Sequence, residues 1–403
     1  MTTFVRRWWV WVFFACTAVA SFAMFQSSAN WQRAPWWPSA LMELTFFFPL
    51  LSSALAGWTA WQGWRHRRAQ LGTFTSFRHP LQVVGQWYRP AMVAAIAAPL
   101  LAICWMAPHL EGRPRAVDLL LIPMAILQLI AWGMLGAVLG RLLPLALSVP
   151  LSVLAAFVAM AFPEASSTMA YRHVFGMHSS CCHLYGTISE TVILASLGFH
   201  LAAAIVLVWV LVGPSWLRAA VATVTLGAVF LVGFRATLPI DDPNGLVPRP
   251  TSELACIGTE PEVCLWPEQE PDRSLVTDTA TTIIESLTDM GITPPTTISA
   301  SETASWSYVV TVKPRDVHDV REILVGGVIA PPYPDCARDQ PWYFPEVVNE
   351  LRTWLWLQLD FDPSRVTTSP LLVDVLQRSE QRQIDWFTAN LRQARTCGVK
   401  PIR

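Results

Sequence analysis

The sequence predicts an α-helical polytopic membrane bundle of about seven transmembrane helices, followed by a C-terminal extracytoplasmic α+β domain. The first observation is composition: 53% of the 403 residues are hydrophobic and 14% are charged, whereas soluble domains carry about a quarter charged residues. The second is that the long apolar runs all precede residue 236. The third is charge: 14 Arg accompany five acids before residue 236, and 24 acids accompany 14 bases after it. An acidic tail excludes a nucleic-acid-binding role for that part.

Seven apolar stretches reach or approach the roughly 20 residues that a helix needs to cross the hydrocarbon core. They are approximately Trp8–Phe25, Ala40–Trp61, Ala91–Leu110, Val117–Gly140, Leu142–Phe162, Thr191–Gly213 and Ala219–Phe234. The first is predicted to be a retained span rather than a signal peptide, because no convincing cleavage site follows it. The last is the shortest. Together these stretches define a transmembrane domain over residues 1–235, with the lipid bilayer as its main partner.

The distribution of Arg between the short loops predicts the orientation of the bundle. Nine Arg fall on one face and four on the other, and the face richer in Arg is normally cytoplasmic. We therefore expect a multi-pass protein of the cell membrane with a cytoplasmic N-terminus. An odd number of spans then places the C-terminal domain outside the cytoplasm.

Six cysteines fall on the predicted outer side, where the oxidising environment allows disulfides to persist. They are Cys181, Cys182, Cys256, Cys264, Cys336 and Cys397. A local Cys256–Cys264 bridge is the preferred pairing in the tail, with Cys336–Cys397 as the second. Four cysteines allow three connectivities, so other pairings stay open.

The outer loop after the fifth span is rich in imidazole and thiol groups. It contains His173, His178, Cys181, Cys182 and His183, and these residue types are the preferred protein ligands of Zn and Cu. The spacing matches no standard zinc finger or metallopeptidase. A structural disulfide with exposed histidines is the alternative to a metal site, and we expect no cofactor.

Polar residues within the predicted spans are candidates for a translocation path, because such groups are costly in lipid and often functional. They are Glu43, Gln128 and His200. In the alternative interpretation, Glu43 reaches the outer interface and His200 stays neutral with one hydrogen bond. On the cytoplasmic side, Arg65, Arg67 and Arg68 open a basic segment broken by Pro80 and Pro90. This segment is predicted either to dock a soluble partner or to contact anionic lipid.

After a Pro-rich linker over residues 236–252, the tail domain is predicted to cover residues 253–403. The acids between Glu260 and Asp272 are interpreted as a solvated acidic loop, with cation binding as the alternative. Helical periodicity predicts helices over about residues 272–290, 345–359 and 370–395. The alternation of Trp306, Tyr308, Val310 and Val312 predicts a strand with one buried face.

Catalytic signatures are absent from the sequence. The chain has no His-Glu-x-x-His, no Gly-x-Ser-x-Gly and no Gly-x-x-x-x-Gly-Lys motif. We therefore expect a non-enzymatic protein that does not itself hydrolyse ATP.

The tail carries the pattern Cys256-x7-Cys264-Leu-Trp-Pro-Glu, followed by Cys336 and Trp354-Leu-Trp-Leu. This pattern resembles actinobacterial membrane proteins of unknown function that are permease-like components of ABC transporters. The resemblance implies a permease-like subunit of an exporter, driven by a separate cytoplasmic nucleotide-binding ATPase. The outer domain would capture a small-molecule or peptide ligand or gate its passage. Seven predicted spans depart from the six usual for such permeases.

Two other function classes stay open from the sequence. One is a non-enzymatic membrane sensor or assembly protein whose extracytoplasmic domain binds a ligand. The other is a membrane-embedded enzyme that uses the His/Cys loop at a metal.

Overall fold

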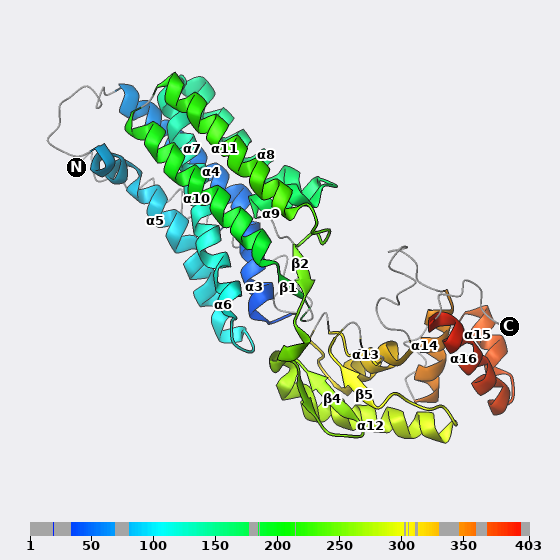
Figure 1. Ribbon diagram of the computed structural model, residues 1–403. Helices are drawn as coiled ribbons and strands as arrows, with labels where there is room; N and C mark the ends of the chain where they lie inside the picture. The colour runs from blue at the N-terminus through cyan, green and yellow to red at the C-terminus, as the bar shows by residue number, and fades with distance from the viewer. Residues whose placement is uncertain are drawn as a thin grey trace. The chain divides into compact units, whose positions relative to one another are not determined.

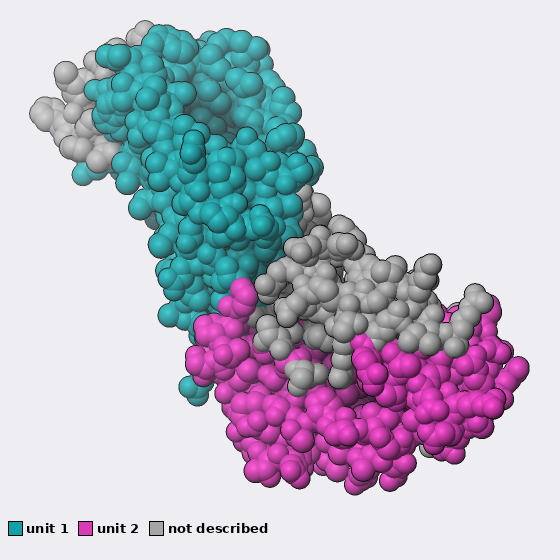
Figure 2. Space-filling model, turned by 45° about the vertical axis from the view of Figure 1, so that its right-hand side comes forward, with its two compact units in different colours: residues 1–182, 186–247 teal, residues 183–185, 248–403 magenta. Residues whose placement is uncertain are grey.

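The computed structural model divides the chain into two compact units (Figure 2). Unit 1 comprises residues 1–182 and 186–247, and unit 2 comprises residues 183–185 and 248–403. The structure describes residues 19, 34–68, 80–176, 184, 186–213, 215–301, 304, 306–310, 313–329, 346–359 and 369–395. The predicted first span lies outside these residues, apart from Val19.

Unit 1 is a helical bundle (Figure 1). Its long helices are α4 (Phe48–Arg68), α5 (Pro80–Met106), α7 (Leu121–Leu142), α8 (Leu145–Ala165), α10 (Glu190–Val212) and α11 (Trp216–Thr237). The short helices are α3 (Trp37–Glu43), η1 (Leu44–Phe47), η2 (Ala107–His109), α6 (Ala116–Leu119) and α9 (Met169–Phe175). Strand β1 (Gly186–Ile188) pairs with β2 (Leu246–Pro248).

Within the described residues, five helical stretches are long and apolar enough to cross a membrane. They are Val84–His109, Ala116–Leu142, Leu145–Pro163, Glu190–Val212 and Trp216–Thr237. These correspond to the third to seventh predicted spans. The shortest predicted span, at residues 219–234, is extended by three residues at each end in α11. The chain is therefore a helical protein with several potential membrane spans, while the count of seven stays a prediction.

The second predicted span differs from the structure in its bounds. A 3-10 turn separates α3 from α4, and α4 continues to Arg68, past the expected end at Trp61. Helix α4 contains several polar residues and is not among the five apolar stretches.

The predicted break at Pro90 is wrong, because α5 begins at Pro80 and continues through Pro90. Proline fits the first turn of a helix, and neighbouring groups accommodate it inside membrane helices.

Helices α4 and α7 pack with their backbones in close contact. A Cβ atom on Gly136 or Gly140 would collide with the backbone of Ala56 or Ala60. The Thr59 hydroxyl donates a hydrogen bond across the contact to the carbonyl oxygen of Gly133 at 2.6 Å. Small residues at turn spacing allow this approach, which is a common way for helices to associate in membranes.

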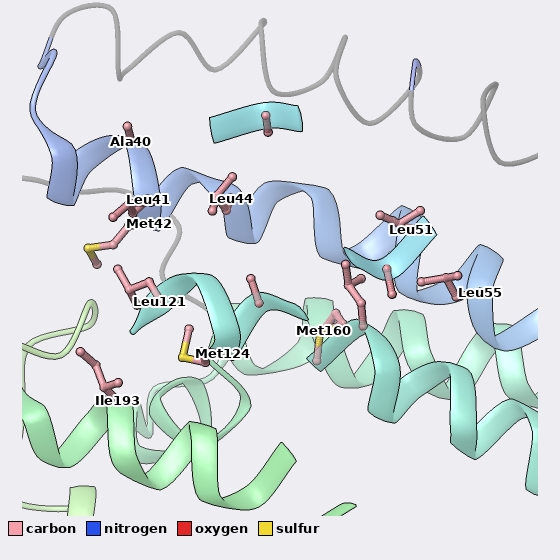
Figure 3. Packing of buried hydrophobic residues seen from close by; sticks show 14 of the residues in the cluster. Ala40, Leu41, Met42, Leu44, Leu51, Leu55, Leu121, Met124, Met160 and Ile193 are labelled. Carbon is pink, nitrogen blue, oxygen red and sulfur yellow. The ribbon is translucent and has the colours of Figure 1, made fainter. Parts of the chain in front are cut away.

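An apolar cluster in unit 1 is formed by described residues from most of its helices. Figure 3 shows Leu51 and Leu55 of α4, Met124 of α7, Met160 of α8 and Ile193 of α10 within this cluster. Each of these side chains is at most 1% exposed. The cluster holds the helices that carry the polar residues described below.

Unit 2 combines a small sheet with helices. The strands are β3 (Ala255–Ile257), β4 (Glu262–Leu265) and β5 (Thr297–Ser299). Their order is β3-β4-β5, with β3 antiparallel and β5 parallel to β4. The helices are η3 (Thr251–Glu253), η4 (Pro267–Asp272), α12 (Arg273–Asp289), α13 (Val317–Ile329), α14 (Glu346–Gln358), α15 (Pro370–Leu376) and α16 (Glu380–Arg395).

Most predicted elements of the tail are present in unit 2. Helices α12 and α14 agree with the predicted ranges, whereas the predicted helix over 370–395 is divided into α15 and α16. Helix α13 was not predicted. The predicted strand is an extended segment joined to β5 by a single bridge at Ser307. Its alternating side chains Trp306, Tyr308 and Val310 are buried as expected.

Candidate functional site

Gln128 on α7 is fully buried and has one unused hydrogen-bonding atom. Its Nε2 donates to the carbonyl oxygen of Phe175 at 2.7 Å and lies 3.0 Å from Sδ of Met160. Because the Phe175 carbonyl oxygen can only accept a hydrogen bond, the Gln128 side-chain atom next to it must be the amide nitrogen and not the amide oxygen. Gln128 Oε1 is left without a hydrogen-bond partner among the described residues.

His200 on α10 is also buried, at 1% exposed. Its Nδ1 lies 2.8 Å from the carbonyl oxygen of Ser196 and 3.4 Å from the Ser196 hydroxyl. The proton of a neutral imidazole therefore resides on Nδ1, since the carbonyl can only accept. Nε2 is then a hydrogen-bond acceptor, and it has no partner in the described part of the chain.

Gly176 brings these two helices to a common point. It ends α9 with a φ of 69°, a left-handed conformation that favours glycine. A Cβ atom at this position would lie 2.6 Å from Oγ of Ser196 and 3.4 Å from Oε1 of Gln128. We call Gln128, Gly176, Ser196 and His200 the polar centre. It contains two acceptor atoms without a hydrogen-bond partner among the described residues, Gln128 Oε1 and His200 Nε2, and no carboxylate.

Two of the three predicted path residues therefore belong to the polar centre. Sequence reasoning missed Ser196 and Gly176. The four-residue spacing between Ser196 and His200 was a usable signal, since it places both on one helix face. Glu43, the third predicted residue, is 1% exposed at the end of α3, so it does not reach water at the interface.

His173 is the only predicted metal ligand in the described part of the chain. It is buried in α9, and its Nε2 lies 2.9 Å from the carbonyl oxygen of Asp242. Burial lowers the pKa of His173, and the hydrogen bond to the Asp242 carbonyl partly opposes this effect. His178, Cys181, Cys182 and His183 lie outside the described residues, so the metal site stays a prediction.

The three predicted docking arginines lie on the last turn of α4. Arg65 and Arg68 lie over the rings of Trp61 and Trp64, at 4.8 and 5.4 Å from the ring centroids. Arg67 donates to the carbonyl oxygen of Leu142 at 3.2 Å, at the end of α7. Arg67 and Arg68 are nevertheless exposed, so they remain accessible to a partner.

The predicted Cys256–Cys264 disulfide is confirmed. The two residues are direct cross-strand partners in the β3–β4 pair. Glu262 has an oxygen close to both sulfur atoms. Because the cysteines are joined to each other, this group has no free thiolate for a metal. Cys336 and Cys397 lie outside the described residues.

The Leu-Trp-Pro-Glu part of the motif has a structural role in unit 2. Trp266 is 1% exposed, and its indole N–H donates to the carbonyl oxygen of Ala300 at 3.2 Å. Glu268 is buried and pairs with Arg249, whose guanidinium lies 4.5 Å from the Trp266 ring centroid. The predicted solvated acidic loop is therefore wrong for Glu268, because an arginine from the Pro-rich segment neutralises it.

Residues 263–397 match the family model described as a domain of unknown function, DUF7224. The match covers the helices of unit 2 that follow the disulfide hairpin, and it includes Cys264 but not Cys256. No curated protein matches the chain, and no solved structure does.

Proposed function

We propose that the chain is a permease-like membrane subunit of an ABC-type exporter, driven by a separate ATPase. In this proposal, the bundle of unit 1 forms the path for a small molecule or peptide. The acidic unit 2 lies outside the cytoplasm and captures the ligand or gates its passage.

The polar centre carries this proposal. Gln128 and His200 come from two different potential membrane spans, and each keeps an acceptor that the described residues do not satisfy. An unsatisfied buried polar atom costs about 1–3 kcal/mol. Such a cost between membrane helices is typical of substrate paths. Gly176 lies against Ser196 and the unsatisfied Oε1 of Gln128, so its lack of a side chain allows α9 to approach both helices here.

Crosslinking in cells tests the coupling to an ATPase. A photo-crosslinking amino acid in place of Arg67, at the exposed end of α4, should capture a protein with a Gly-x-x-x-x-Gly-Lys motif. The same amino acid in place of Leu101, which is 69% exposed on α5, should not. No ATPase adduct at position 67 in the native host would contradict the permease proposal.

A transport readout tests the polar centre. Cells lacking the chain should retain a small polar compound or peptide that cells with the wild-type chain release. A Gln128→Leu/His200→Leu variant that reaches the membrane should fail to restore release. Leu101→Ala serves as the matched control and should restore it.

The second candidate is a membrane sensor or assembly protein with a ligand-binding unit 2. The backbone contact between α4 and α7 favours it, because such tight packing suits a rigid anchor. In that case position 67 captures no ATPase and the Gln128→Leu/His200→Leu variant behaves like the wild type.

A further inference from the structure

One end of the unit 1 bundle contains arginines and no carboxylates. Helices α4, α7 and α10 end there, while α5 and α11 begin there (Figure 1). The terminal turns of three of these helices carry the basic residues Arg65, Arg67, Arg68, Arg141 and Arg218. The sequence has no Asp or Glu over residues 44–110, 119–163 or 191–240. The counter-charge for this end must therefore come from outside the bundle helices.

Arg141 lies on the last turn of α7 at this end. It is half-buried, and its Nη1 donates to the carbonyl oxygen of Leu211 at the end of α10. No ion pair in the described part of the chain involves Arg141. The partial negative charge at a helix C-terminus offsets only part of a full positive charge. The part of the Arg141 charge that the helix end does not offset is partly buried, and this favours binding of an anion.

Tyr88 supplies a second hydrogen-bond donor close to Arg141. It is 2% exposed and packs in the same apolar cluster as Val138 and Leu211. Its hydroxyl has no hydrogen-bond partner among the described residues, and it lies within electrostatic range of Arg141. A guanidinium and a hydroxyl group together suit an acceptor with several oxygens.

His66 completes the surroundings of Arg141. Its ring stacks edge-on against Trp87 with 5.5 Å between centroids. Burial and the charge of Arg141 lower the pKa of His66 to about 4, so the imidazole is neutral at physiological pH. His66 therefore adds no positive charge next to Arg141.

We propose that Arg141 and the Tyr88 hydroxyl bind the phosphate of an anionic phospholipid headgroup. Arginine matches phosphate oxygens in a bidentate geometry. The position favours a lipid because Arg141 lies at the end of a potential membrane span, at the depth of the headgroups. Trp87 and Trp209 lie at the same end, and indole rings prefer this interfacial region. Basic pockets between membrane helices bind anionic lipids in the same way.

The test uses the purified full chain in a neutral detergent, so no partner protein is present. Phosphatidylglycerol with a fluorescent acyl chain is titrated, and binding is followed by anisotropy, with phosphatidylcholine as the reference. We expect phosphatidylglycerol to bind more tightly. Arg141→Gln should weaken its binding about tenfold or more, because a charge-assisted contact is lost. Tyr88→Phe should weaken it several-fold, and neither change should affect phosphatidylcholine.

Arg68→Gln is the matched control, because it removes the same charge from an exposed side chain at the same end. Equal losses in Arg68→Gln and Arg141→Gln would mean general charge attraction and would overturn the site. Equal binding of the two lipids would also overturn it. Displacement of phosphatidylglycerol by inorganic phosphate at matched ionic strength would show a free-anion site, against the lipid assignment. Should Arg141→Gln fail to fold, Arg141→Lys and Tyr88→Phe decide the question.

Discussion

The guanidinium of Arg249 and the carboxylate of Glu268 form a buried ion pair, with 3.0 Å between Nη1 and Oε2. Their side chains are 4% and 6% exposed. The same guanidinium also pairs with Glu253 at 2.6 Å and lies over the ring of Trp266. One arginine thus attaches the segment before β3 to the Trp-Pro-Glu sequence after β4.

The first prediction concerns this ion pair. Glu268→Gln should lower the free energy of unfolding of unit 2 by about 1.5–3 kcal/mol, because the buried guanidinium loses one of its two carboxylate partners and keeps only the half-exposed Glu253. Pulsed proteolysis of the full chain in increasing urea measures this change. Arg378→Gln breaks the more exposed pair with Asp374 and should cost at most about 1 kcal/mol. Equal effects of the two substitutions would contradict the structural role of the Arg249–Glu268 pair.

The Arg249–Glu268 ion pair also shows what could not be predicted from the sequence. The Pro-rich composition around Arg249 predicts a linker, and the cluster of acids around Glu268 predicts a solvated loop. Each local signal is real, but the pairing joins residues 19 positions apart through the tertiary fold. Local composition carries no information about such a partner.

Elements set by local periodicity were predicted far better. The apolar runs before residue 236 and the amphipathic face of α12, with Val276, Ile283 and Leu287 buried, depend only on neighbouring residues. Helix α4 ends later than predicted because its arginines continue the helix beyond the apolar run. In the polar centre, Gln128 and His200 were identifiable as polar residues in apolar runs. The approach of Gln128 and Ser196 to Gly176 depends on the packing of three helices.

The second prediction concerns the disulfide. Replacing Cys256 and Cys264 by serine should lower the free energy of unfolding of unit 2 by about 2–3 kcal/mol, because the bridge restricts the unfolded chain. Urea titration of the full chain, followed by proteolysis of unit 2, measures the change. A reducing agent should destabilise the wild type at least as much, and an unchanged stability of the wild type on reduction would contradict the role of this bridge. Destabilisation of the serine variant by the reductant would point to a further disulfide.

The third prediction concerns the contact between α4 and α7. Gly140→Ala should destabilise unit 1 by about 1–3 kcal/mol, because the new methyl group collides with the backbone of Ala60. Thermal unfolding of the purified chain in detergent measures this. Gly198→Ala on α10 is the matched control, since a Cβ there meets no atom within 4 Å. The better helix propensity of alanine should make that change neutral or stabilising by up to about 1 kcal/mol.

The fourth prediction concerns the pH dependence that His173 gives to unit 1. Its pKa in the folded state is below the ordinary value of 6.5, chiefly because the ring is buried. Below pH 6.5 the unfolded chain therefore binds a proton that the folded chain does not. The contribution of His173 to stability is complete above this pH and is lost progressively as the pH falls below it. His173→Gln removes the titrating group and should flatten the decline.

Thermal unfolding of the full chain in detergent, at a series of pH values between about 8 and 5, measures this effect around the ordinary histidine pKa. The wild type should lose stability on acidification more steeply than His173→Gln. The glutamine can still donate toward the Asp242 carbonyl, which His173 Nε2 approaches at 2.9 Å, so the two proteins should be most similar at high pH and diverge as the pH falls. Parallel curves would mean that His173 is protonated equally easily in the folded and unfolded states. Burial in α9 would then not govern its titration.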